Sequence, residues 1–217
     1  MTVNDIQQRL KAYEGEGKRM FVTSSFQSHS LPLLHMISTS GVPVDVLFIN
    51  TGFHFPETLC FRDEISKRFG LKMIDVRSHV PKNLQRDPEG QFYFISDPDY
   101  CCFLNKTQPL EPFLQSYDIW INGVRRQQSG QRAAMEIEQD TPHRAKRFHP
   151  LLDWTSKDIH EYRKAHDLPS HPLEEKGYLS IGCEPCTRKF DANDDRSGRW
   201  FGMKKTECGL HTDLIKR

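Results

Sequence analysis

The sequence predicts an α/β fold in which a parallel β-sheet is covered by helices on both faces. Two observations carry this prediction. Short apolar stretches alternate with segments of helical periodicity along the first half of the chain, a pattern typical of strand–helix–strand units. Three of the apolar stretches also end in polar residues, which parallel strands would bring to one edge of the sheet.

The first strand is expected over residues 19–24, which contain the apolar run Met-Phe-Val. After a polar turn, the leucine-containing segment 31–37 is expected to be helical. A second strand is expected over residues 44–49, where valine, leucine, phenylalanine and isoleucine dominate. The second helix is expected over residues 57–69, because phenylalanine and isoleucine recur there on one helical face.

The remaining two strands are expected over residues 72–76 and 117–121. Polar segments follow the first, second and fourth strands at residues 24–25, 50–52 and 122–126. The carboxyl ends of parallel strands share one edge of the sheet, where ligands bind in such folds. The sequence therefore predicts a polar binding site formed by these three segments.

The chain of 217 residues is long enough for one sizeable domain with a short extension. We expect an α/β domain over residues 1–190 and a mobile tail over residues 191–217, because the polar run after residue 190 has no apolar period. The 30 basic and 29 acidic residues leave a formal charge of +1. That balance does not favour nucleic acid or an anionic membrane as the main partner.

The N-terminal residues show no basic region followed by an apolar run, and no apolar stretch is long enough to span a bilayer. We therefore expect a cytoplasmic protein with reduced thiols. Six cysteines in a reducing compartment are better explained as metal ligands or nucleophiles than as a disulfide framework.

Four of the cysteines form two close pairs, Cys101-Cys102 and Cys183-Glu184-Pro185-Cys186. Two such pairs are typical of a four-thiolate site for zinc or for an iron–sulfur cluster. Adjacent cysteines point in divergent directions, so both thiolates reach one zinc ion only with local distortion. A cluster with iron atoms at separate corners can be bound by two such thiolates more easily. Buried structural cysteines without a metal are the alternative.

Cys208 stands apart in a polar segment with Lys204, Lys205 and His211 nearby. Nearby cations lower the pKa of a thiol and raise its thiolate fraction, which a nucleophile needs. An incidental cysteine in a flexible tail is the alternative. Cys60 lies among apolar residues of the second expected helix, and we expect it to be a small core residue without a role.

Together these motifs resemble the adenylyl-sulfate and phosphoadenylyl-sulfate reductases, in particular the cluster-containing branch of assimilatory sulfate reduction. The resemblance covers most of the chain and rests on the Cys101-Cys102 pair, the CxxC segment 182–187 and the Glu-Cys-Gly-Leu-His segment 207–211. It implies an adenine nucleotide alpha-hydrolase-like domain of the PP-loop type. It also implies reduction of adenosine 5'-phosphosulfate to sulfite and AMP, with thioredoxin or glutaredoxin as the reductant.

By this resemblance, the four paired cysteines would bind a [4Fe-4S] cluster, and Cys208 would take the sulfonate group as an S-sulfocysteine. Lys106 would lie between cluster and substrate, Arg196 and Arg199 would close over the phosphosulfate, and His211 would hydrogen-bond near the nucleophile. Such cations would offset the repulsion between a thiolate and an anionic substrate. The implied substrate contacts are Ser24, Ser25, Thr51, Gly52 and Arg125.

Two positions depart from the family pattern. The phosphate loop at residues 25–30 reads Ser-Phe-Gln-Ser-His-Ser and lacks both glycines of the pyrophosphatase-type loop, and Asn50 stands where an aspartate is more usual. The sequence Ser-Ser-Phe at 24–26 resembles phosphoadenylyl-sulfate reductases, whereas the paired cysteines resemble adenylyl-sulfate reductases. The 3'-phosphorylated substrate therefore stays an alternative, and the oligomeric state, including a homo-oligomer, stays open.

Two other classes of protein compete with this interpretation. A PP-loop ATP pyrophosphatase of tRNA thiolation would share the sheet, but it needs a glycine-rich loop and a more basic surface. A zinc-stabilised binding module would explain the paired cysteines but would give no role to Cys208 or to the arginines.

Overall fold

A computed structural model describes residues 1–189, 198–200 and 207–211 of the chain. Within these residues, six strands form one sheet in the order β3-β2-β1-β4-β6-β5. Neighbouring strands are parallel except for β5 and β6, which are antiparallel. The strands are β1 (Met20–Thr23), β2 (Asp45–Ile49), β3 (Met73–Val76), β4 (Ile119–Asn122), β5 (Glu138–Gln139) and β6 (Lys146–Phe148). The predicted α/β fold with a mostly parallel sheet is confirmed.

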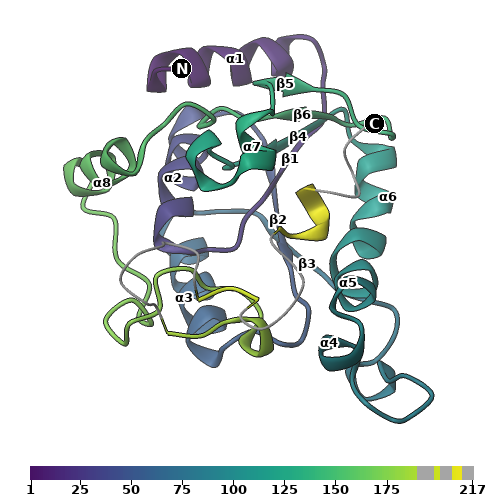
Figure 1. The fold of residues 1–217 in the computed structure, drawn as a ribbon. Helices are drawn as coiled ribbons and strands as arrows, with labels where there is room; N and C mark the ends of the chain where they lie inside the picture. The colour runs from purple at the N-terminus through teal and green to yellow at the C-terminus, as the bar shows by residue number, and fades with distance from the viewer. Residues whose placement is uncertain (190–197, 201–206, 212–217) are drawn as a thin grey trace.

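Helices lie on both sides of this sheet (Figure 1). The α-helices are α1 (Val3–Gly15), α2 (Leu31–Ser40), α3 (Pro56–Arg68), α4 (Tyr93–Ser96), α5 (Pro98–Cys102), α6 (Gln108–Ser116), α7 (Gly130–Ala133) and α8 (Ser156–Ala165). The 3-10 turns are η1 (Ser28–Ser30), η2 (Lys82–Leu84), η4 (Arg126–Gln128), η5 (Glu184–Cys186) and η6 (Gly209–His211), and η3 (Phe103–Thr107) is a π-helical turn. The expected elements correspond to β1–β4, α2 and α3 with small shifts at their ends, while α1, α8, β5 and β6 go beyond them.

The two faces of the sheet belong to separate hydrophobic clusters. Val22 of β1 and Val46 of β2 pack against residues of α1, α2, α3 and α8. Their neighbours in sequence, Phe21 and Leu47, pack against α6 on the opposite face. Successive strand residues point to opposite sides, so these near-continuous apolar strands are explained by burial on both faces.

The exposure of Cys60 corrects one expectation, because we predicted a core residue. Cys60 lies on α3, which buries its other side through Thr58, Phe61, Arg62 and Ile65. A surface helix buries only one stripe of residues, and Cys60 falls outside that stripe although its sequence neighbours are apolar.

No helix among the described residues is both long enough and apolar enough to cross a membrane.

The direction of the strand order reverses between β1 and β4. From β1 the sheet continues through β2 and β3 on one side and through β4 and β6 on the other. Thr23 and Asn122, the last residues of β1 and β4, are partners in register. Sheets of this kind bind ligands beyond the carboxyl ends of strands at such a reversal. A ligand site is therefore expected next to Thr23 and Asn122.

The buried imidazole of His149 should make the stability of the protein depend on pH. Burial lowers the pKa of His149 to about 4, aided by the charges of Arg147, Arg132 and Arg126 and opposed by a hydrogen bond to the Glu136 carbonyl. As the pH falls through about 6.5, the His149 imidazole of the unfolded chain therefore binds a proton, whereas that of the folded chain stays neutral. Stability is fully present above that pH and is lost as the pH falls toward 4.

The expected loss from His149 is about 2 kcal/mol between pH 8 and pH 5. His149→Gln should reduce the pH dependence of the unfolding free energy by that amount, measured by thermal or urea unfolding at both pH values. His79→Gln, which changes an exposed histidine, is the matched control and should leave the dependence unaltered. An equal pH dependence in the His149 variant would contradict the assignment.

Candidate functional site

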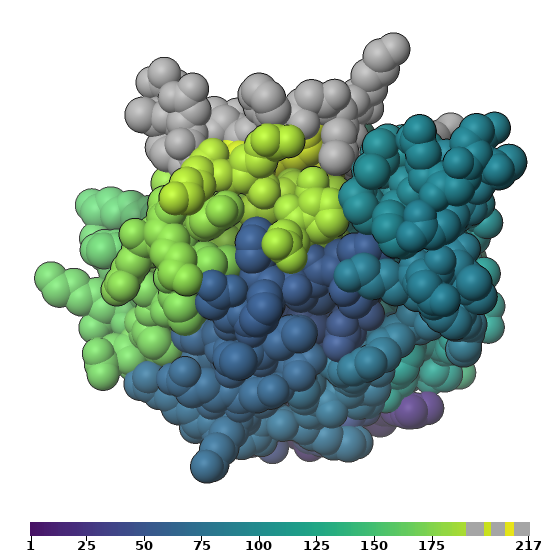
Figure 2. All heavy atoms as spheres, turned by 90° about the horizontal axis from the view of Figure 1, so that it is seen from below, coloured from purple at the N-terminus to yellow at the C-terminus, as the bar shows by residue number. Residues whose placement is uncertain are grey.

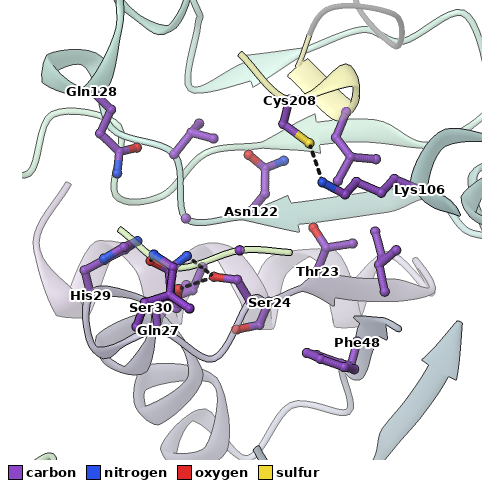
Figure 3. A pocket seen from close by; sticks show the side chains of 18 of the residues that line it. Thr23, Ser24, Gln27, His29, Ser30, Phe48, Lys106, Asn122, Gln128 and Cys208 are labelled. Carbon is purple, nitrogen blue, oxygen red and sulfur yellow. Dashed lines mark hydrogen bonds between the residues drawn. The ribbon is translucent and has the colours of Figure 1, made fainter. Parts of the chain in front are cut away.

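A central cavity lies at the carboxyl ends of β1 and β4, where the strand order reverses (Figure 3). Its floor includes Thr23 and Asn122, and one wall is the loop at residues 24–30 between β1 and α2. Lys106 and Cys208 close the opposite side. The predicted convergence of strand-end polar residues therefore involves the first and fourth strands.

The loop at residues 24–30 keeps a glycine-like backbone without a glycine. Phe26 has a φ of 54°, in the left-handed region that ordinary side chains rarely adopt. Its ring is buried against Phe48 with 5.8 Å between ring centroids, and its backbone N–H donates to Ser24 Oγ at 3.1 Å. Packing and this hydrogen bond offset the backbone strain, so the missing glycines do not prevent a tight turn.

The same loop presents several small polar side chains to the cavity. Ser25 and Ser30 lie 3.2 Å apart through their hydroxyls, and the Gln27 amide donates to Ser25 Oγ at 3.1 Å. Ser30 is also the N-cap residue of α2, whose N-terminal end carries a partial positive charge. A wall of hydroxyls next to a helix N-terminus suits an anionic group such as a phosphate.

Cys208 and Lys106 form the reactive pair of the cavity. Lys106 Nζ lies 3.8 Å from Cys208 Sγ (Figure 3). Burial alone would raise the pKa of the Cys208 thiol, but the Lys106 ammonium, a backbone hydrogen bond from Leu210 and the Arg199 guanidinium together lower it, against opposition from Glu207. The balance favours a thiolate at Cys208, which is the nucleophilic form of cysteine.

Glu207 anchors the segment that carries Cys208. Its carboxylate is buried and accepts two hydrogen bonds from Arg132, at 3.0 and 2.9 Å, and one from the Ser129 hydroxyl at 2.9 Å. It also accepts from the backbone N–H of Cys208 at 2.9 Å. One carboxylate thus fixes the backbone of the nucleophile to the segment around α7.

A second anchor lies on the other side of Cys208. Arg147 is fully buried, stacks over Trp120 at 4.4 Å and donates to the carbonyl oxygen of Leu210 at 2.5 Å. Two of its nitrogens, Nε and Nη1, have no other partner within the described residues. No motif in the sequence marks Glu207, Arg132 or Arg147 as functional, because their contacts join segments far apart in the chain.

Arg199 reaches the cavity across Gly182. A Cβ atom at Gly182 would collide with the Arg199 guanidinium, so any larger residue there would displace the guanidinium from its present place. The guanidinium donates to the Ile181 carbonyl at 3.3 Å and stacks over Trp200 at 4.6 Å. A positive charge is thereby held at the edge of the cavity, on a segment whose Ile181 N–H donates to Gln27 of the loop at residues 24–30.

All four paired cysteines line a second, smaller cavity. The segment that ends at residue 189 brings Cys183 and Cys186 to it, and Figure 2 shows this yellow-green segment against both the blue region around α3 and the teal region around α4 and α5. Cys101 and Cys102 come from α5. Residues from two distant parts of the chain therefore meet at one place.

The contacts within this second cavity are those of a thiol site. Thr51 Oγ1 lies 3.3 Å from Cys183 Sγ, and the Asn105 amide donates to Cys101 Sγ at 3.6 Å. Burial, together with the neighbouring thiols, raises the pKa of Cys101 to about 12 and that of Cys186 to about 11. These pKa values describe neighbouring thiols that resist ionisation unless a cation compensates their charge.

The four thiols are a donor set that suits a soft metal centre. Among residues 1–189, 198–200 and 207–211, no three His, Cys, Asp or Glu side chains come close enough together to hold one metal ion. Thiolate ligands favour zinc, copper(I) or iron–sulfur clusters. Four thiolates are the ligand set of structural zinc sites and of [4Fe-4S] clusters alike.

Lys106 connects the two cavities, because it lines both. It belongs to the π-helical turn η3 directly after the Cys101-Cys102 pair, and such turns often occur at functional sites. Burial disfavours its ammonium, yet the negative charges of Cys102, Cys183 and Cys208 hold the pKa of Lys106 well above its usual range.

The other residues expected at the site are distributed as follows. Ser24, Ser25 and Arg199 line the central cavity, and Arg125 lines an adjoining cavity that also contains Arg132 and Arg199. Thr51 lines the cysteine cavity instead, and the Gly52 carbonyl accepts from Lys82. Arg196 lies outside the described residues, and His211 is described only as the last residue of η6.

Comparison with known proteins gives a consistent result. The family model for the phosphoadenosine phosphosulfate reductase domain matches residues 19–189. Adenosine 5'-phosphosulfate reductase of Rhodococcus opacus is 38% identical over 203 residues, covering 92% of this chain and 82% of the relative. Phosphoadenosine 5'-phosphosulfate reductase of Gloeobacter violaceus is 38% identical over 200 residues, covering 90% and 83%.

Among solved structures, phosphoadenylyl-sulfate reductase from Candida auris is similar with a TM-score of 0.66 and 22% sequence identity. The similarity covers 82% of this chain and 88% of that one. At this identity the likeness establishes the fold alone.

The link between Lys106 and Cys208 makes a prediction about thiol reactivity. Lys106→Met keeps the apolar stem but removes the charge that lowers the pKa of Cys208, so the pKa of this thiol should rise. Alkylation of Cys208 by iodoacetamide should then become several-fold slower below pH 8, measured by peptide mass spectrometry between pH 6 and pH 9. Lys11→Met, on the exposed face of α1, is the control. An unchanged pH profile for the Lys106 variant would show that Lys106 does not set the charge of the thiol.

Proposed function

Since this chain belongs to the phosphoadenosine phosphosulfate reductase family, we propose that it reduces adenosine 5'-phosphosulfate to sulfite and AMP with Cys208 as the nucleophile. The observation that carries the proposal is the pairing of Cys208 Sγ with the half-buried Lys106 ammonium at 3.8 Å, beside a cavity suited to a phosphate. A thiolate held next to a cation can approach an anionic substrate that would otherwise repel it.

The first chemical step would be an attack on sulfur. Cys208 Sγ forms a bond to the sulfur atom of the substrate, the sulfur–oxygen bond to the phosphate breaks, and AMP leaves with the electron pair of that bond. Lys106 and Arg199 offset the charge of the sulfonate oxygens during this step. The loop at residues 24–30 and the N-terminal end of α2 hold the phosphate of the leaving group.

The second step would release sulfite from the S-sulfocysteine. A thiolate of thioredoxin or glutaredoxin attacks Cys208 Sγ, and sulfite leaves with the electron pair of the sulfur–sulfur bond. The second thiol of the reductant then restores free Cys208 and leaves the reductant as a disulfide. Both electrons come from the dithiol, and a reducing compartment such as the cytoplasm fits this requirement for free thiols.

The unphosphorylated nucleotide is the preferred substrate in this proposal. The paired cysteines support it, because they resemble the cluster-containing branch of the family. The sequence Ser-Ser-Phe at residues 24–26 supports the 3'-phosphorylated nucleotide as the second candidate, and relatives named for either substrate are similar to this chain.

We further propose that Cys101, Cys102, Cys183 and Cys186 hold a [4Fe-4S] cluster. The support is that all four thiols line one cavity. When bound, the cluster would supply a compact charged centre beside Lys106, while the dithiol reductant supplies the electrons. The thiols of this cavity, rather than Cys208, then act as its ligands.

The function is tested by mass analysis of the intact protein after incubation with each nucleotide. Adenosine 5'-phosphosulfate without reductant should add one sulfonate to the peptide containing Cys208, and thioredoxin should remove it with release of sulfite. Cys208→Ser should give no adduct and at least a 1000-fold loss of turnover, since the nucleophile is gone, while Cys60→Ser should behave as wild type. A value of kcat/KM tenfold higher for the 3'-phosphorylated nucleotide would reverse the substrate assignment.

The cluster proposal is tested on protein prepared without oxygen. Wild-type protein should be brown and contain about four irons per chain. Cys183→Ser should lose most of the visible absorption and iron, whereas Cys208→Ser should retain both because Cys208 is not a ligand. Wild-type protein that contains zinc and no iron would refute the proposal.

A further inference from the structure

The side-chain amide of Asn122 is buried in the central cavity without a hydrogen-bond partner. Asn122 is 3% exposed, and neither Oδ1 nor Nδ2 has a partner within the part of the chain that the structure describes. Exchanging the amide oxygen and nitrogen leaves the same unpaired group, so the observation does not depend on how the two atoms are assigned.

An unpaired buried amide is costly for a fold. Buried polar groups in proteins are nearly always hydrogen-bonded, and exceptions call for a specific explanation such as a functional role. An apolar side chain of the same shape would avoid the cost entirely. Asn122 is at the last position of β4, where its three preceding strand residues, Ile119, Trp120 and Ile121, are all apolar. The amide therefore interrupts an apolar strand, and it makes no hydrogen bond among the described residues that would stabilise the fold.

The position of Asn122 indicates what would satisfy it. Asn122 lies beside Thr23 at the reversal of the strand order, and in Figure 3 its amide lies between the loop at residues 24–30 and the Cys208–Lys106 pair. Lys106 and Arg199 line the same cavity and favour an anionic occupant. The NH2 group of an amide can donate two hydrogen bonds to the oxygens of such an anion.

We propose that Asn122 binds the sulfonate end of the sulfonucleotide by donating a hydrogen bond to a sulfonate oxygen, an inference that rests on the proposed function. The sulfur atom has to lie next to Cys208 Sγ to be attacked, while the phosphate lies toward the loop at residues 24–30. Asn122 stands between these two places. Each of its amide atoms exposes less than 1 Å², so its hydrogen-bonding groups are kept from bulk water until a ligand group reaches them.

The test uses Cys208→Ser protein, which cannot react, and measures Kd for adenosine 5'-phosphosulfate and for AMP by calorimetry. Asn122→Leu removes the amide but keeps the shape. The loss of a hydrogen bond to a charged group should weaken binding of adenosine 5'-phosphosulfate by about 10-fold or more, whereas AMP, which lacks the sulfonate, should lose less than about threefold. Asn122→Asp places a carboxylate at the same point and should weaken adenosine 5'-phosphosulfate further through repulsion.

A stability measurement separates binding from folding. Without nucleotide, Asn122→Leu should melt at the same temperature as its parent or higher, because the amide makes no contact to lose. Asn4→Asp makes the same chemical change as Asn122→Asp on the exposed first turn of α1 and should alter neither Kd.

The outcomes distinguish the two proposals. If the Cys208→Ser parent binds no sulfonucleotide, the proposed function fails and the role of Asn122 falls with it. If the parent binds and Asn122→Leu binds equally well, loses equal affinity for both nucleotides, or melts at a lower temperature, the proposed function stands and the sulfonate contact is refuted.

Discussion

The half-buried ammonium of Lys106 is the charge that both sulfur sites share. A partly buried cation is unfavourable unless negative charge lies near it, and the groups that favour the ammonium here are Cys102 and Cys183 of the cysteine cavity on one side and Cys208 on the other. The lysine and these thiols therefore stabilise one another's charged forms. A change of charge in the cysteine cavity alters the field at Cys208 through a single side chain, with no movement of the backbone required.

The position of Cys208 is defined by contacts that leave its sulfur free. Glu207 holds the backbone on one side and Arg147 holds the Leu210 carbonyl on the other. Removing one partner of a buried ion pair typically costs about 3–5 kcal/mol, so replacing either Arg132 or Glu207 alone is expected to disturb the segment that carries Cys208. The sulfur can take and lose a group while these anchors stay intact, which is what an acceptor of a transferred group requires.

The periodic parts of the fold were predictable from sequence, and the aperiodic parts were not. The strands β1–β4 are recognisable from apolar runs in the sequence, and the helices α2 and α3 from apolar residues at helical spacing. The strand β6 reads Lys-Arg-Phe, and its burial includes Arg147 stacking over Trp120, a contact between residues far apart in sequence. The helix α1 had usable signals in its Thr2–Asp5 capping box and in Ile6 and Leu10, but these signals lie before the first strand, where the alternating pattern gives no guide.

The candidate site divides in the same way. The two cysteine pairs and the isolated Cys208 can be recognised in the sequence, and they line two adjoining cavities in the structure. Glu207 and Arg132 are 75 residues apart, and Asn122 is one asparagine among several. Their significance lies in what they face after folding, and no periodicity or spacing in the chain encodes that.

The Arg132–Glu207 pair also constrains how the protein can diverge. Because each charge is buried against the other, replacement of either one alone leaves an uncompensated charge, and the two positions are expected to change together or not at all during evolution. The segment that carries the nucleophile is thus not an interchangeable module: a tail taken from a relative would function only with the arginine that evolved beside it.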